Sequence, residues 1–194
     1  MAEDRHAKLR RLILSIATEI IRNEGLSALQ ARRLAKSADC SVGTLYNVYG
    51  NLDRLIIAAN TLTLDDLMAR LNARVDELRG MALDDALVSL AFEYLKFANT
   101  ERGAWRALFE HRLTTEQTVP DDYRLKQAEL FAVVETVLSL KVDDPAERQI
   151  ASRAIFGAVH GIVTLALDEK LRDFDEQQTE QQLKTVVGAI ARGL

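Results

Sequence analysis

Cysteine and histidine are scarce in this chain, and each scarcity excludes a class of protein. One cysteine among 194 residues cannot build a disulfide framework within the chain, and it fits a reducing, cytoplasmic environment. Three histidines, at positions 6, 111 and 160, offer no metal-ligand cluster. Glycine-rich phosphate loops and nucleophile elbows are also missing from the sequence. We therefore expect no metal, no cofactor and no catalytic residues.

Long apolar runs are missing as well. The longest nearly uncharged segment, residues 154–167, contains a histidine and is shorter than the roughly 18 residues that suggest a membrane span. The polar start of the chain has no signal-peptide pattern. We therefore expect a cytoplasmic protein with no membrane partner.

The net charge of −4 is small, but it is unevenly distributed. Residues 1–60 carry nine Lys and Arg against six Asp and Glu, whereas residues 61–194 carry sixteen against twenty-three. A basic N-terminal end attracts phosphate, and an acidic remainder is repelled from a duplex. Ordinary surface variation also produces such a split, so it supports DNA binding only together with a motif.

Apolar residues recur at helical spacing along the whole chain, and no alternating strand pattern competes with them. They predict a first helix over residues 9–21, which Gly25 ends, and a long helix from Asn51 into the seventies, which Gly80 interrupts. Further helices are expected at residues 82–99, 102–113, 121–140, 145–170 and 176–193. We therefore predict an all-α fold.

Residues 34–49 contain two short helical patterns separated by a tight polar turn, which is typical of a helix-turn-helix. The hydroxyl of Ser41 is expected to cap the second helix, over residues 42–48, whose inner face is Leu45 and Val48. The outward residues are Gly43, Thr44, Tyr46 and Asn47. A short, weakly charged helix with an exposed face is expected to enter the major groove of DNA.

Residues 10–55 resemble the N-terminal domain of the TetR (tetracycline repressor-like) family of bacterial transcriptional regulators. The resemblance rests on Gly-Thr-Leu-Tyr at 43–46, followed by Tyr49 and Leu55, and on Ala17 and Gly25 in the first helix. Residues 156–165 are similar to the "WHG" type of C-terminal domain in this family, with Phe156 in place of Trp. The family implies an all-helical homodimer whose C-terminal domain takes up a small molecule and thereby releases DNA.

The resemblance also implies a division into two domains. Residues 1–52 are expected to form a three-helix, helix-turn-helix DNA-binding domain. Residues 53–194 are expected to form a helical bundle for ligand binding and dimerisation.

The chain departs from the family pattern at positions that matter for DNA affinity. Leu52 stands where the family usually has a phosphate-binding Lys, and Val48 replaces a common His or Tyr. Asp39 replaces the turn glycine but tolerates a left-handed backbone, whereas Gln30 and Ala31 are poor caps for the second helix. Because Leu52 and Val48 replace two usual phosphate contacts, we predict a shallow dependence of DNA binding on salt.

The residues expected at the DNA interface are Arg32, Ser41, Val42, Gly43, Thr44, Tyr46, Asn47 and Asn51. By the family pattern, the hydroxyls of Thr44 and Tyr46 meet phosphates, and the amide of Asn47 has the geometry to pair with adenine. Arg32 reaches a guanine or a phosphate, or is a solvated helix charge. Tyr49 is expected to pack on the first and fourth helices.

Four further cations are expected near the start of the first helix. They form a DNA-backbone arm or simply a charged helix end: Arg5, Lys8, Arg10 and Arg11.

The helix over residues 150–167 is apolar on nearly all sides, and such a helix must be buried all round. We therefore predict a homodimer sealed by the last two helices, with Gly157, Ala158 and Gly161 permitting close approach. The last helix adds an apolar stripe that includes Val187. The alternative is a central helix in a monomer.

Six side chains on body helices are candidates for a small, apolar effector site: Tyr94, Phe97, Trp105, Phe109, Phe131 and His160. Aromatic residues at helical spacing more often form plain core, which is the alternative interpretation. The sequence thus predicts a ligand-responsive repressor that binds a palindromic operator as a dimer. The alternatives are a helical protein-interaction module and an all-α enzyme that uses His160.

Overall fold

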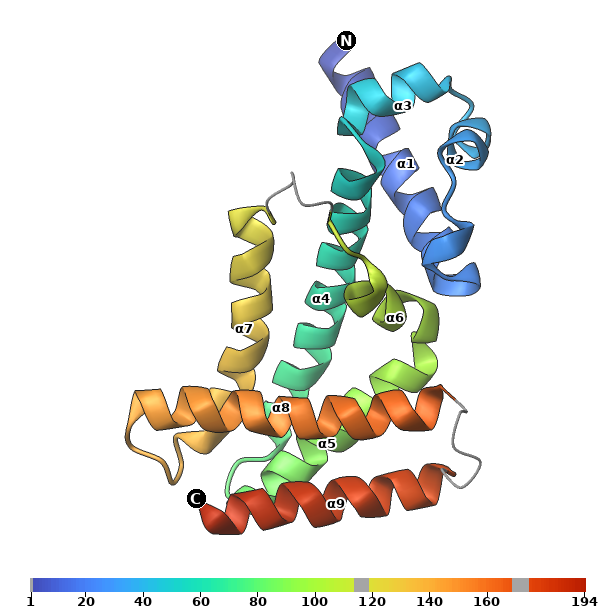
Figure 1. Ribbon diagram of the computed structural model, residues 1–194. Coiled ribbons are helices and arrows are strands. Elements are labelled where there is room, and N and C mark those ends of the chain that lie inside the picture. The colour runs from blue at the N-terminus through green and yellow to red at the C-terminus, as the bar shows by residue number, and fades with distance from the viewer. Residues whose placement is uncertain (1, 114–118, 169–174) are drawn as a thin grey trace. The chain divides into compact units, whose positions relative to one another are not determined.

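The computed structural model describes residues 2–113, 119–168 and 175–194, and the elements in these ranges are helical (Figure 1). They are α1 (Ala2–Glu24), the 3-10 turn η1 (Leu26–Ala28), α2 (Ala31–Ser37), α3 (Val42–Tyr49), α4 (Leu52–Glu77), α5 (Leu83–Thr100), α6 (Arg102–Glu110), α7 (Asp121–Leu138), α8 (Pro145–Leu167) and α9 (Glu176–Gly193). The all-α prediction is confirmed.

Several predicted helix ends differ from the structure: α1 begins at Ala2, before the predicted residues 9–21, and α7 ends at Leu138 rather than at residue 140. The helix predicted over 102–113 ends at Glu110, because the backbone of His111 turns to an extended conformation. The helix predicted over 145–170 ends at Leu167, and residues 169 and 170 lie outside the described residues. Gly25 ends α1 with a φ of 84°, as its position predicted.

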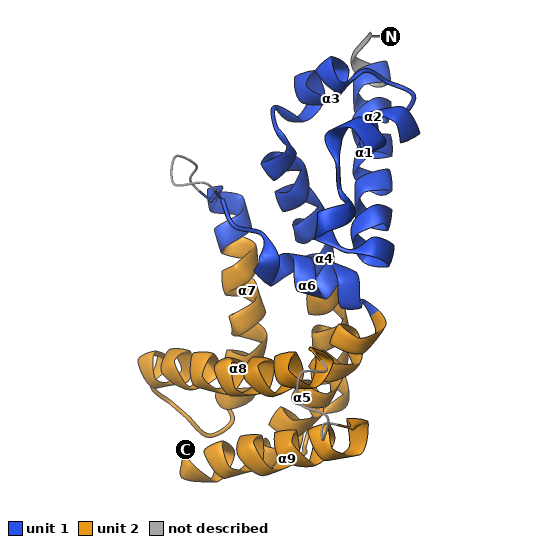
Figure 2. Cartoon of the chain, turned by 45° about the vertical axis from the view of Figure 1, so that its right-hand side comes forward, with its two compact units in different colours: residues 1–65, 101–124 blue, residues 66–100, 125–194 orange. Residues whose placement is uncertain are grey.

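The chain divides into two compact units (Figure 2). Unit 1 comprises residues 1–65 and 101–124, and unit 2 comprises residues 66–100 and 125–194. This division differs from the predicted functional domains 1–52 and 53–194, because α6 packs on α1 and η1 and so joins the first unit. The functional domains themselves stay a prediction.

Unit 1 has a core drawn from α1 to α4 and closed by α6. Its fully buried side chains include Ile13 of α1, Leu34 of α2, Leu45 of α3 and Leu55 of α4. Gly103 lets α6 approach α1 very closely, since a Cβ there would overlap the carbonyl oxygens of Ile21 and Arg22. The helix-turn-helix therefore rests on a base that includes α6.

Unit 2 is built on packing of α5 against α9 and α8, and α8 and α9 lie side by side (Figure 1). Asp144 and Asp175 cap α8 and α9 by accepting hydrogen bonds from Ala146 N and Gln178 N. One face of α8 is buried, at four-residue spacing: Ala151, Ile155, Val159, Val163 and Leu167. This spacing places a single inward stripe on the helix.

Among the described helices, α8 is long and apolar enough, by length and composition alone, to cross a membrane. The apolar stretch is longer than residues 154–167 suggested, because Arg153 is the one Lys, Arg, Asp or Glu within residues 150–167. Core helices meet the same criterion, and a third of that stretch is buried inside the chain.

Candidate DNA interface and apolar cavity

The turn before α3 is held by local interactions that the sequence predicted. Asp39 has a φ of 49°, the left-handed conformation expected of the residue that replaces glycine. The backbone of Ser41 is extended, and its Oγ accepts a hydrogen bond from Thr44 N at 3.0 Å. The same Oγ lies 2.8 Å from the Thr44 hydroxyl. The cap therefore fixes both the start of α3 and the Thr44 side chain.

The two faces of α3 differ in burial. Leu45, Val48 and Tyr49 are buried in the core of unit 1. Tyr46 is 40% exposed, and Gly43 and Asn47 are also exposed. The helix thus presents a polar outer face, which is what a helix that reads base edges requires.

Tyr49 and Arg10 join α3 to α1. The Tyr49 hydroxyl donates to the carbonyl oxygen of Arg10 at 2.8 Å, and Arg10 Nη1 donates to the carbonyl oxygen of Val48 at 3.0 Å. The guanidinium also lies 4.4 Å from the centre of the Tyr49 ring. Burial raises the pKa of Tyr49, and the Arg10 charge partly offsets that rise. Arg10 is therefore a structural contact, which differs from its predicted place in a backbone arm or charged helix end.

The other residues predicted to contact DNA differ in whether their side chains are exposed or engaged in contacts within unit 1. Arg32 is exposed on α2, while Asn51 Oδ1 accepts from Arg54 N at 2.8 Å and caps α4. Arg5 and Lys8 line one hollow of about 540 Å³ together with Thr44 in the first turn of α3. These two cations thus lie beside the N-terminal end of α3.

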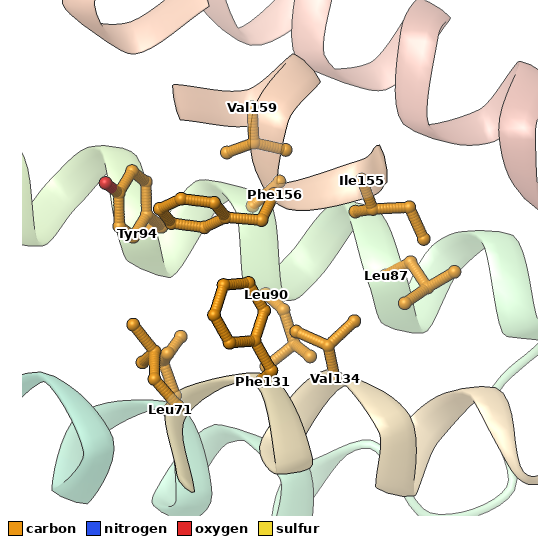
Figure 3. Close-up of a pocket in the computed structure, with 11 residues that line it drawn as sticks. Leu71, Leu87, Leu90, Tyr94, Phe131, Val134, Ile155, Phe156 and Val159 are labelled. Atoms are coloured by element: carbon orange, nitrogen blue, oxygen red, sulfur yellow. The ribbon is translucent and has the colours of Figure 1, made fainter. Parts of the chain in front are cut away.

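Unit 2 holds a small cavity of about 50 Å³ between its helices (Figure 3). Its lining is Leu71, Leu87, Leu90, Ala91, Tyr94, Leu130, Phe131, Val134, Ile155, Phe156 and Val159. Figure 3 shows Phe131 and Val134 on one side, facing Phe156 and Ile155 on the other. Every lining side chain is hydrocarbon except for the hydroxyl of Tyr94.

The Tyr94 hydroxyl is engaged by a histidine beside the cavity. It lies 2.9 Å from His160 Nδ1, and His160 Nε2 lies 3.4 Å from the Thr164 hydroxyl. The His160 ring stacks on Phe156 with centroids 5.4 Å apart. Burial lowers the pKa of His160, which favours the neutral ring.

The structure separates the six residues predicted for an effector site. Tyr94 and Phe131 line the cavity, and His160 contacts two of its walls. Phe97 is buried with the Arg70 guanidinium 5.0 Å from its ring centre and does not line it. The prediction that all six share one cavity is therefore corrected.

Trp105 and Phe109 belong to unit 1, where their ring centres lie 5.5 Å apart. Sequence reasoning missed the aliphatic lining because a search for aromatics cannot tell which apolar faces meet. Phe156, which stands in place of Trp in the segment that resembles the family's C-terminal domain, was the signal that pointed to this lining.

Comparisons with known proteins agree with this architecture. Residues 87–190 match the family model described as "Tetracyclin repressor-like, C-terminal domain". The chain belongs to the TetR family of transcriptional regulators. An uncharacterised HTH-type transcriptional regulator of Mycobacterium tuberculosis is 28% identical over 187 residues, which cover 95% of this chain and 83% of that protein.

Solved structures show the same fold at low identity. A protein of unknown function from Rhodococcus sp. RHA1 has a TM-score of 0.77 and 19% identity, over 96% of this chain and 95% of that one. A TetR-family transcriptional regulator from Streptomyces coelicolor has a TM-score of 0.68 and 20% identity, over 95% and 98% of the two chains.

Histidine burial in this TetR-family chain predicts a loss of stability in mild acid. Because the pKa of His160 in the folded chain lies below its ordinary value of 6.5, the unfolded chain binds the proton more readily. The contribution of neutral His160 to the free energy of unfolding is fully present above pH 6.5. It is lost as the pH falls through the lower pKa that His160 has in the folded chain. His111, whose pKa burial also lowers, acts in the same direction.

Denaturant unfolding of the wild type and of His160→Gln between pH 7.5 and pH 5 measures this effect. We expect the free energy of unfolding to fall less steeply with pH in His160→Gln. Equal slopes in the two proteins would show that His160 does not contribute.

Proposed function

We propose that this TetR-family protein is a ligand-responsive repressor that binds a palindromic operator as a homodimer. The observation that carries the proposal is α3, a helix seated by Leu45, Val48 and Tyr49 with its polar face turned outward. Base edges in the major groove are read by such a face. In a dimer on a palindrome, the two α3 helices lie about 34 Å apart, one helical turn of DNA.

Individual roles are proposed for the residues expected at the DNA interface. We assign base contacts to Asn47, Arg32, Val42 and Gly43, and phosphate contacts to the hydroxyls of Thr44 and Tyr46. Ser41 and Asn51 act by capping α3 and α4, because their side-chain oxygens accept backbone hydrogen bonds there. Asn47→Ala is expected to relax discrimination at one base pair by about 1–3 kcal/mol.

Tyr46 and Tyr49 form a matched pair for a test, because the same substitution removes one hydroxyl from each face of α3. Tyr46→Phe is expected to weaken binding to all duplexes and leave stability unchanged, since its hydroxyl is assigned to a phosphate. Tyr49→Phe is expected to lower the free energy of unfolding by about 1 kcal/mol, since it loses the bond to the Arg10 carbonyl.

Fluorescence anisotropy on DNA fragments retained by the wild type, together with urea unfolding, separates the two effects. If Tyr46→Phe bound DNA as tightly as the wild type, the docking of α3 proposed above would be wrong.

The homodimer is proposed from the outer face of α8. Ile150 is 71% exposed and Leu165 is 46% exposed, and Gly157 is exposed between them on the helix. Apolar surface of this kind on a long helix marks an association face, and a two-fold axis lets the same face cover itself. Val187, predicted on the interface stripe, is instead fully buried within unit 2, so the proposed face uses Val186 and Ile190 of α9.

Two exposed leucines give a controlled test of this face. Leu165→Arg is expected to convert the dimer to a monomer, because a charge would be buried at the seam. Leu140→Arg, at a leucine that is 68% exposed just beyond α7, is expected to leave the dimer intact. Sedimentation velocity at micromolar concentration measures both, and a dimeric Leu165→Arg would contradict the proposal.

The effector site is proposed at the cavity of unit 2. Because the Tyr94 hydroxyl is engaged by His160, the lining offers an incoming molecule hydrocarbon surface, which selects a small uncharged apolar compound. The volume of about 50 Å³ is far below the roughly 300 Å³ of ordinary ligand pockets, so a ligand must spread the helices to enter. A multidrug binding protein, EbrR, solved in complex with imidazole, has a similar fold at 23% identity and a TM-score of 0.64, over 93% of this chain and 91% of that one.

For a ligand to weaken DNA binding, it must bind the state in which the helices around the cavity have moved apart more tightly than the closed state. Toluene is therefore expected to raise the melting temperature and to weaken operator binding, by about 5- to 150-fold in a typical coupled system. Val159→Phe, which fills the cavity, is expected to lose both responses and keep DNA binding. Leu62→Phe, at an exposed residue, is the control. Unchanged toluene effects in Val159→Phe would place the effector elsewhere.

A further inference from the structure

The recognition helix α3 contains no lysine or arginine. Most of the affinity of a protein for DNA comes from cations that neutralise backbone phosphates. The cations that hold α3 on DNA must therefore come from elements beside it. Their identity decides how the helix is oriented in the groove.

Several cations of unit 1 are already occupied. Arg33 makes a two-bond ion pair with Glu24, with its shorter N···O distance 2.5 Å. Arg22 pairs with Glu101 at 2.9 Å. Arg10 is bonded to the backbone of α3 from the inner side. These three cations are engaged in contacts within unit 1 and do not lie at the α3–α4 turn as free charges.

Arg54 occupies that turn. Gly50 ends α3 with a φ of 80°, and Asn51 caps α4 by accepting from Arg54 N. Arg54 is exposed, and its Nη1 lies 3.3 Å from the position that a Cβ would take on Gly50. The side chain therefore folds back along the end of α3. Within the described residues, no carboxylate forms an ion pair with it.

We propose that Arg54 binds a DNA backbone phosphate at the C-terminal end of α3. This inference rests on the proposed DNA-binding function. It places a cation at the end of α3 opposite to Arg5 and Lys8, which share a hollow with Thr44 at the N-terminal end. Phosphates line both edges of the major groove, so cations at both ends fix the register of the helix.

The proposal changes the expectation drawn from Leu52. Leu52 is half-buried in the first turn of α4, where the family pattern has a phosphate-binding Lys. Arg54 lies two residues further along the same turn, on a different side of α4, and its side chain reaches back to Gly50 at the end of α3. We assign the missing charge to this side chain. A phosphate contact by Arg54 adds to the salt dependence of DNA binding. That dependence is then steeper than the loss of the lysine at position 52 would predict by itself.

The test uses a duplex selected by the wild-type full chain from a random-sequence pool, with affinity measured over a range of salt concentrations. Arg54→Gln is expected to weaken binding about tenfold, the size of one charge-assisted hydrogen bond, and to reduce the salt slope by about one per bound subunit. Arg54→Lys is expected to retain most of both. Arg79→Gln removes the same charge from unit 2, at an exposed arginine paired with Asp76, and is expected to change neither.

Rescue separates a phosphate contact from a structural role. Leu52→Lys is expected to restore affinity and salt slope in the Arg54→Gln background, and to add little to the wild type. If Arg54→Gln keeps the wild-type slope, or if Leu52→Lys fails to rescue it, the inference is overturned while the proposed function stands. A wild type that selects no duplex from the pool overturns the proposed function itself.

Discussion

An eight-residue helix is marginal by itself in water, and this constraint governs the helix-turn-helix of unit 1. Three contacts hold α3: the Ser41 cap at its start, burial of Leu45 and Val48, and the Arg10–Tyr49 pair at its end. The cap uses the exposed side-chain oxygen of Ser41, whereas the other two contacts use buried or part-buried groups. Gly43, Tyr46 and Asn47 stay exposed on the outer face of the helix.

Packing on α1 and a buried hydrogen bond to α4 explain why α6 belongs to unit 1. The close approach at Gly103 brings the first turn of α6 onto the last turn of α1, and Asn60 of α4 donates to the Ala107 carbonyl of α6 at 3.1 Å. Asn60 is a buried polar side chain, 2% exposed, so breaking this bond would strand an amide in the core. The helix α6 is therefore held by contacts to both α1 and α4.

In unit 2 the central constraint is that α8 has more apolar surface than the described residues cover. The stripe from Ala151 to Leu167 is buried, whereas Ile150 and Leu165 remain exposed on the other side. Composition alone does not distinguish a membrane span from a core helix or an association face. The hydrogen-bonded capping of α8 by Asp144 and its packing on α9 are features of a helix that is packed within a folded unit.

The sequence by itself determined the features that depend on neighbours a few residues apart. Helix positions, the Gly25 stop, the left-handed Asp39 and the Ser41 cap are of this kind, because each is decided within about one turn. Only the tertiary structure decided which side chains meet across the chain. It joined Arg10 to Tyr49, placed Phe156 rather than Phe97 at the cavity, buried Val187 and turned Arg54 toward α3. Helical periodicity shows which face is apolar, but the partner of that face is set by how the helices pack.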